Sequence, residues 1–184
     1  MERETNDFIN HLRQGNLTAQ QRLLTDYGPS VFRLIMRIVG RQEDAEEVYQ
    51  DVFVKALDKI STFEPRKSSL STWLSRIAYN ESLNHLRQSR LHLLYLYIDD
   101  MELEEDNEDI SFENTYDEHT IQLLEKAITM LPTTDQTLLS LFYHENLSLQ
   151  EISYITGSKP STVGSRLSRL RKKLYKLIKN YSEQ

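Results

Sequence analysis

The stretch SLQEISYITGSKPSTVGSRLSRLRKKL, which covers residues 148–174, decides the fold of the C-terminal part of this chain. Ser148 and Glu151 have the spacing of a capping box, in which each side chain satisfies a free backbone N–H at a helix start. Gly157 breaks that helix, and a longer helix is expected from Ser161. Its apolar residues recur at intervals of four, three and four positions, at Val163, Leu167, Leu170 and Leu174. Two helices joined by a short glycine turn indicate a helix-turn-helix.

The second helix of this pair is expected to enter the major groove of DNA. Polar and basic residues lie opposite its apolar stripe, at Ser161, Thr162, Ser165, Arg166, Ser168, Arg169, Lys172 and Lys173. Hydroxyls and a cation near its start suit contacts to base edges, and the basic end suits phosphates. A solvated amphipathic helix also carries a charged outer face. The capping box, the turn glycine and the basic helix together favour DNA binding.

Two more helices are expected upstream of this motif. One apolar face consists of Ile121, Leu124, Ile128 and Leu131, and Pro132 ends that helix because proline has no amide donor. The next helix places Leu138, Leu141 and Phe142 inside. Residues 120–184 are therefore predicted to form a four-helix domain.

The acidity of the chain is concentrated in one segment. Residues 98–119 contain eleven acidic residues and no lysine or arginine, whereas residues 120–184 contain nine basic and five acidic residues. Mutual repulsion prevents such an acidic segment from forming a packed core, so we interpret it as a flexible linker between two domains. The net charge of −6 is therefore compatible with nucleic-acid binding elsewhere in the chain.

Residues 1–97 are predicted to form a helical bundle, and the whole protein is predicted to be all-α. Apolar positions with helical spacing are Val31, Leu34, Ile35, Ile38, Ala45, Val48, Val52, Ala56, Leu70, Leu74 and Ile77. Phe8, Ile9 and Leu12 indicate an opening helix. A second short helix is expected to close at Tyr27-Gly28-Pro29.

Composition narrows the class of protein. The longest apolar run, residues 92–98, is far shorter than the roughly 18 residues that a membrane span needs. No signal peptide is evident at the N-terminus, and the absence of cysteine excludes disulfides, thiol catalysis and thiolate metal sites. We expect a soluble cytoplasmic protein. Its five histidines are scattered and it has no glycine-rich phosphate loop, so we expect neither an enzyme nor a cofactor.

A second candidate site lies in STWLSRIAYNESLNHLR, residues 71–87. Helical spacing places Arg76, Asn80 and Arg87 on one side, with Trp73 and Tyr79 nearby. Rings stack on bases and cations hold phosphates, so this pattern suits single-stranded nucleic acid. The alternative is that Trp73 is a core anchor and the cations are ordinary surface residues.

The acidic cluster of residues 43–51 has two interpretations. Its acids lie near an expected helix start, where they complement the helix dipole. Asp44, Glu47 and Asp51 also form a ridge that a basic protein partner could contact. Spacing alone favours the first interpretation.

Taken in order, these segments resemble the extracytoplasmic-function class of bacterial sigma factors, within the sigma-70 family, over residues 8–97 and 121–178. Asp44-Ala45-Glu46-Glu47-Val48 with Gln50-Asp51-Val52-Phe53 is similar to the helix that binds the clamp helices of the largest subunit of core RNA polymerase. The resemblance implies that residues 1–97 bind polymerase and that residues 120–184 read the -35 promoter element. The implied polymerase contacts are Asp44, Glu46, Glu47, Gln50, Asp51 and Phe53.

The resemblance also implies that residues 71–87 melt and read the -10 element. Trp73-Leu74 with Arg76-Ile77-Ala78-Tyr79-Asn80 is similar to that family segment, and the loop 63–69 is placed to receive a flipped base. The implied -10 contacts are Arg66, Lys67, Ser69, Trp73, Arg76, Tyr79, Asn80 and Arg87. The implied -35 contacts are Ser161, Thr162, Ser165, Arg166, Arg169, Lys172 and Lys173.

Three positions depart from the family pattern: Ser161, Gly164 and Asn84. Gly164 replaces a usual lysine and weakens its helix by about 1 kcal/mol relative to alanine. The family commonly has an anti-sigma factor, which is therefore an expected partner alongside polymerase and promoter DNA. One alternative function is a stand-alone helix-turn-helix regulator with a sensing or dimerising N-terminal domain. Another is an interaction protein that uses its acidic linker as a nucleic-acid mimic.

Overall fold

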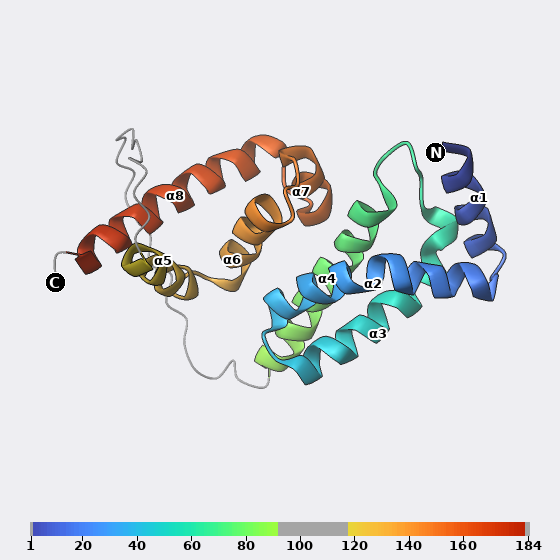
Figure 1. The fold of residues 1–184 in the computed structure, drawn as a ribbon, viewed down its shortest axis with the longest axis horizontal. Helices are drawn as coiled ribbons and strands as arrows, with labels where there is room; N and C mark the ends of the chain where they lie inside the picture. Colours follow the sequence, from blue (N-terminus) through green and yellow to red (C-terminus); the bar gives the residue numbers. More distant parts are fainter. Residues whose placement is uncertain (1, 92–117, 183–184) are drawn as a thin grey trace.

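The computed structural model describes residues 2–91 and 118–182, and every regular element in those two ranges is helical (Figure 1). The N-terminal domain contains α1 (Glu2–Arg13), α2 (Leu17–Val39), α3 (Gln42–Lys59), the 3-10 turn η1 (Ile60–Thr62) and α4 (Leu70–Leu91). The C-terminal domain contains α5 (Glu118–Thr129), α6 (Thr133–Leu139), the π-helical turn η2 (Ser140–His144), α7 (Leu149–Thr156) and α8 (Pro160–Ser182). The predicted all-α class is confirmed.

The predicted end of the second helix at Tyr27-Gly28-Pro29 is wrong, because α2 continues through it to Val39. Pro29 lies inside the helix, where its missing N–H removes one hydrogen bond. Gly28 lies directly against α3, since a Cβ atom at Gly28 would lie 2.5 Å from the Tyr49 hydroxyl. The glycine therefore allows α2 and α3 to pack closely. Gly28 before the proline and Val31 after it are both buried, and this packing keeps the helix continuous.

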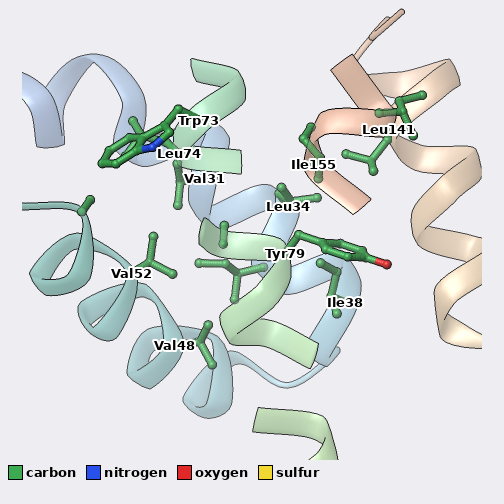
Figure 2. Packing of buried hydrophobic residues seen from close by; sticks show 14 of the residues in the cluster. Val31, Leu34, Ile38, Val48, Val52, Trp73, Leu74, Tyr79, Leu141 and Ile155 are labelled. Atoms are coloured by element: carbon green, nitrogen blue, oxygen red, sulfur yellow. The ribbon is translucent and has the colours of Figure 1, made fainter. Parts of the chain in front are cut away.

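The N-terminal core is formed by α2, α3 and α4, which pack against one another. The predicted apolar face of α2 is buried at Val31, Leu34, Ile35 and Ile38. Ala45, Val48, Val52 and Ala56 of α3 are also buried. Figure 2 shows Val48 and Val52 pointing from α3 toward the interior that Leu74 of α4 shares.

The C-terminal domain confirms the predicted helix-turn-helix. Ser148 caps α7, and Gly157 ends it in the left-handed conformation with φ 75°. The helix α8 then buries Val163, Leu167, Leu170 and Leu174. The predicted stripe of α8 therefore faces its own domain, with the intervening positions turned outward.

The predicted linker, residues 98–119, lies almost wholly outside the described residues. Its last two positions, Glu118 and His119, belong to α5, so the helix begins earlier than the predicted boundary at residue 120. Among the described residues, no helix is long and apolar enough to cross a membrane.

The two domains pack directly against each other. The helix α4 contacts α7, and α2 contacts α6. Buried residues of both domains form one continuous hydrophobic cluster. Figure 2 shows Ile155 on the side of α7 that faces Leu34 of the N-terminal domain, whereas Leu141 of η2 lies farther into the C-terminal domain.

Candidate nucleic-acid interface

The start of α7 is fixed by a complete capping box. The Ser148 backbone N–H and hydroxyl donate to Oε2 of Glu151 at 2.9 and 2.8 Å. The Glu151 N–H donates to the Ser148 hydroxyl at 3.3 Å. The Ser148 backbone N–H, and after it the Ser148 hydroxyl, lower the pKa of the Glu151 carboxyl, whereas partial burial of the carboxyl acts to raise it. The carboxylate therefore stays ionised and holds the first helix of the motif at its start.

The outward face of α8 carries exposed polar groups at its N-terminal half. Ser161, Thr162, Ser165 and Arg169 are exposed, and Lys172 and Lys173 are half-buried farther along. This order gives hydroxyls and one arginine near the helix start and cations toward its end. Gly164 lies beside α7, where a Cβ would meet Leu149 at an ordinary contact distance of 3.5 Å. Packing alone therefore does not require glycine there.

Arg166 is placed differently from the other residues of this predicted set. Its guanidinium forms an ion pair with Asp135 at 2.6 Å and donates to the Thr134 hydroxyl at 3.0 Å. Asp135 and Thr134 belong to the first turn of α6, so Arg166 is engaged within its own domain. Arg166 and Tyr79 also line a small pocket between the two domains. In this arrangement Arg169 is more available to DNA than Arg166.

The aromatic residues predicted in α4 are buried. Trp73 is 7% exposed and packs against Phe63 with ring centroids 5.4 Å apart, which fits the core-anchor alternative. Tyr79 is 9% exposed, and burial raises the pKa of its hydroxyl, while Arg166 and Arg87 oppose that rise. The rings therefore shape the interior of the domain instead of standing free for base stacking.

The polar and basic residues of α4 are at the surface. Arg76, Asn80 and Arg87 are exposed. The Arg76 guanidinium lies over the Tyr154 ring of α7, 4.7 Å from its centroid. Asn80 and Arg87 thus present an amide and a cation outward, while Arg76 is covered by the second domain on one side.

The loop before α4 combines two exposed cations with a serine that fixes the start of the helix. Arg66 and Lys67 are exposed, and Lys67 pairs with Glu64 at 2.7 Å. The Ser69 hydroxyl accepts the Thr72 N–H at 3.1 Å, so Ser69 helps to fix the start of α4. Within the predicted set, Arg66 and Lys67 are the loop residues best placed to reach a nucleic acid.

The acidic helix α3 presents most of its predicted contacts outward. Glu46, Glu47, Gln50 and Asp51 are exposed. Asp44 is half-buried with Oδ1 3.7 Å from Nε2 of His85, and Phe53 is 5% exposed against the Tyr49 ring. Phe53 is therefore a core residue and Asp44 faces α4.

Sequence reasoning missed two residues that extend the exposed acidic stripe of α3. Val54, 61% exposed, and Asp58, also exposed, follow Glu47 and Asp51 at helical spacing. The spacing could have revealed them, since positions 47, 51, 54 and 58 share one helix face. The contacts of Arg37 and Tyr154 with the other domain were also missed, because no sequence pattern marked them.

Two family models match this chain, one in each domain. The Sigma-70 region 2 family model matches residues 23–91, and the Sigma-70, region 4 model matches residues 121–174. The chain is 28% identical to the ECF RNA polymerase sigma factor SigW of Bacillus subtilis, over 94% of this chain and 95% of SigW. It is 27% identical to the RNA polymerase sigma-H factor of Pseudomonas aeruginosa, over 93% and 92% of the two chains.

A solved structure shares the fold. The sigma factor RpoE, crystallised with the anti-sigma factor NepR from Bartonella quintana, superposes with a TM-score of 0.63 at 24% identity, covering 86% of this chain and 96% of that one. The two sigma-70 regions lie on the two domains described above, in the same order. The chain therefore belongs to the extracytoplasmic-function class of the sigma-70 family, the sigma factors that direct RNA polymerase to promoters.

Proposed function

We propose that α3 attaches this sigma factor to core RNA polymerase through its exposed acidic stripe. Glu47, Asp51, Val54 and Asp58 define the acidic stripe, and Glu46 and Gln50 flank it. An exposed valine among carboxylates supplies an apolar contact beside charges that complement a basic partner. This stripe, within the segment that matches sigma-70 region 2, is the observation that carries the proposal.

Promoter recognition is assigned to the two remaining surfaces. The exposed start of α8, with Thr162, Ser165 and Arg169, supports reading of the -35 element in the major groove. Asn80 and Arg87 of α4 with Arg66 and Lys67 of the preceding loop support capture of the opened -10 element. Strand opening in this scheme is driven by binding energy, and the chain needs no catalytic step of its own.

An anti-sigma factor is a further proposed partner. The RpoE structure that shares this fold is a complex with the anti-sigma factor NepR, which supports a similar restraint here. Because core polymerase and promoter DNA are the proposed partners, we also place the protein in the cytoplasm.

The test is a charge reversal of the acidic stripe. The double variant Glu47→Lys with Asp51→Lys should lose binding to core polymerase by at least about tenfold, since each partly desolvated contact contributes about 1–3 kcal/mol. The control is Asp7→Lys with Asp26→Lys, which makes the same charge change at exposed positions of α1 and α2. Binding is measured by titrating labelled protein with core polymerase.

If the stripe variant and the control bind equally well, the acidic stripe is not the polymerase interface. If the protein is instead a stand-alone helix-turn-helix regulator, it should bind promoter DNA specifically without polymerase. That result, with no binding of the wild-type chain to core polymerase, would replace the sigma-factor mechanism.

A further inference from the structure

The helix α1 ends in a fixed geometry, and Arg13 is its last residue. The Gly15 N–H donates to the Leu12 carbonyl at 3.0 Å, and the Asn16 N–H donates to the His11 carbonyl, also at 3.0 Å. This pair of bonds is a Schellman motif, and Gly15 adopts the left-handed conformation that it needs, with φ 72°. The backbone that carries the Arg13 side chain therefore has one defined conformation.

Apolar burial holds α1 on the rest of the N-terminal domain. Phe8, Ile9 and Leu12 are buried, and α1 contacts both α2 and η1. The Arg22 guanidinium of α2 lies over the Phe8 ring, 4.9 Å from its centroid. Moving the end of α1 away from η1 would expose these apolar side chains to water, which is unfavourable.

Arg13 connects this helix end to the first residue of the loop 63–69. Its guanidinium Nη2 donates to the backbone carbonyl of Phe63 at 2.8 Å. A loop carbonyl has no partner in a helix or sheet, and a charged donor forms a stronger hydrogen bond with it than a neutral donor does. The match to sigma-70 region 2 begins at residue 23, so this contact comes from a helix outside the matched segment.

The two ends of the loop are held by different groups. At its start, the Phe63 ring is 2% exposed and packs against Trp73, while its carbonyl is held by Arg13. At its end, the Ser69 hydroxyl accepts the Thr72 N–H. The carbonyl contact at Phe63 is therefore where the path of the loop backbone is set as it leaves the core.

Few contacts order the loop between these ends. The Lys67 N–H donates to the Glu64 carbonyl at 3.0 Å, and the two side chains form an exposed ion pair. The Ser68 hydroxyl is buried, but among the described residues it has no hydrogen-bond partner, so it does not hold the loop in place. Arg66 is exposed. The orientation of Arg66 and Lys67 thus depends strongly on how the start of the loop is fixed.

We propose that Arg13 is a positioning residue for promoter opening, which fixes the loop so that Arg66 and Lys67 are presented to the opened strand. The proposal rests on the proposed function, in which these two cations help to capture the opened -10 element. Arg13 does not contact DNA in this scheme and acts only through the Phe63 carbonyl. Without Arg13 the loop samples more conformations, and DNA binding must then order it at a cost in free energy.

Hydrogen exchange in the free protein tests the contact. Arg13→Met keeps an apolar side chain and removes the donor, so amide exchange in segment 63–69 should speed up at least about threefold. Arg13→Lys retains a charged donor and should recover part of the protection. The matched control is Arg33→Met, which makes the same change at an exposed position of α2 and should exchange as wild type does. Equal exchange in wild type and Arg13→Met would show that Arg13 does not order the loop.

Promoter opening by the holoenzyme tests the consequence. Arg13→Met should slow the rise of 2-aminopurine fluorescence in the -10 element about threefold to tenfold, because a partly exposed charged hydrogen bond contributes less than a buried one. Core polymerase should bind this variant as tightly as wild type. In the background Arg66→Ala with Lys67→Ala, Arg13→Met should add no further slowing, since residues that act through one another are not additive. Full additional slowing in that background would overturn the proposal.

Failure of the positioning role and failure of the proposed function give different results. If Arg66→Ala with Lys67→Ala opens the promoter at the wild-type rate, the loop does not capture the -10 element and that part of the proposed function is wrong. Hydrogen exchange in the free protein still decides whether Arg13 orders the loop. If exchange speeds up in Arg13→Met while opening keeps the wild-type rate, and the loop variant is slow, the positioning role alone is rejected.

Discussion

Arg166 of α8 and Asp135 of α6 form an ion pair of 2.6 Å in which the aspartate side chain is only 14% exposed. The pair holds an arginine of the predicted recognition set against the first turn of α6. The next arginine along the helix, Arg169, is exposed. The structure therefore distinguishes two arginines that the sequence pattern placed in one group.

Arg169→Ala should reduce discrimination between promoter and unrelated duplex more than Arg166→Ala does. A good base contact contributes about 1–3 kcal/mol of discrimination, so the ratio of affinities should fall at least about fivefold for Arg169→Ala. Arg166→Ala should instead lower the thermal stability of the C-terminal domain, because Asp135 loses its partner. Holoenzyme binding to promoter and non-promoter duplexes, with thermal unfolding in parallel, measures both effects. A larger loss of discrimination for Arg166→Ala would reverse this assignment.

Gly28→Ala should destabilise the N-terminal domain by about 1–2 kcal/mol despite alanine's higher helix propensity. The added Cβ would lie 2.5 Å from the Tyr49 hydroxyl, and the Tyr49 ring is held beside Phe32 and Phe53. Overpacking of this kind typically costs about 1–3 kcal/mol. Urea unfolding measures the free energy of unfolding.

The partner variant Tyr49→Phe removes only the hydroxyl, leaving the ring carbon Cζ 3.6 Å from the added Cβ. Gly28→Ala should therefore be tolerated in the Tyr49→Phe background. Equal destabilisation in both backgrounds would show that the hydroxyl is not the obstacle.

Glu151→Gln should destabilise the protein at neutral pH and lose that effect in acid. The pKa of Glu151 is held below its ordinary value of 4.5, chiefly by the Ser148 backbone N–H. Its stabilisation is therefore fully present above pH 4.5 and is lost as the pH falls through the lower folded pKa. Loss of a cap of this kind costs about 1 kcal/mol.

Thermal unfolding of wild type and Glu151→Gln at several pH values between neutral and acid checks this. The control Glu125→Gln, at an exposed position of α5, should show no such convergence. A constant difference between wild type and Glu151→Gln across the pH range would be incompatible with the cap as described.

The sequence predicted the positions of the helices better than the contacts between them. Apolar spacing and the capping box placed α7 and α8, because local propensity and burial agree there. The end of α2 was misplaced at Gly28-Pro29, because tertiary packing against Tyr49 overrides the usual breaker signals. Contacts such as Arg37 with Glu145 join residues far apart in the chain, and no periodicity reveals them.

The residues of the candidate site could also be predicted only in part from the sequence. Exposed polar residues of α3, α4 and α8 could be identified from helical spacing, since a residue opposite an apolar stripe faces outward. The burial of Trp73 and Phe53 could not be predicted in this way, because aromatic residues suit a core and a binding surface equally well. Pairing of Arg166 with Asp135 depends on how α6 meets α8, which spacing within one helix does not specify.

Strand opening by the holoenzyme tests the central claim most directly. The double variant Asn80→Ala with Arg87→Ala removes an exposed amide and an exposed cation from α4 and leaves Arg76 on Tyr154. The control, Gln21→Ala with Arg33→Ala, removes the same two chemical groups from α2. Both should bind core polymerase as wild type does.

The readout is the fluorescence of 2-aminopurine placed in the -10 element, which rises when the base unstacks. Unstacking costs a few kcal/mol per base, and the polar contacts of α4 must offset that cost. We predict that promoter opening slows by at least about tenfold in Asn80→Ala with Arg87→Ala and is unchanged in the control. Opening at the wild-type rate by the α4 variant, with polymerase binding intact, would contradict the role assigned to this helix.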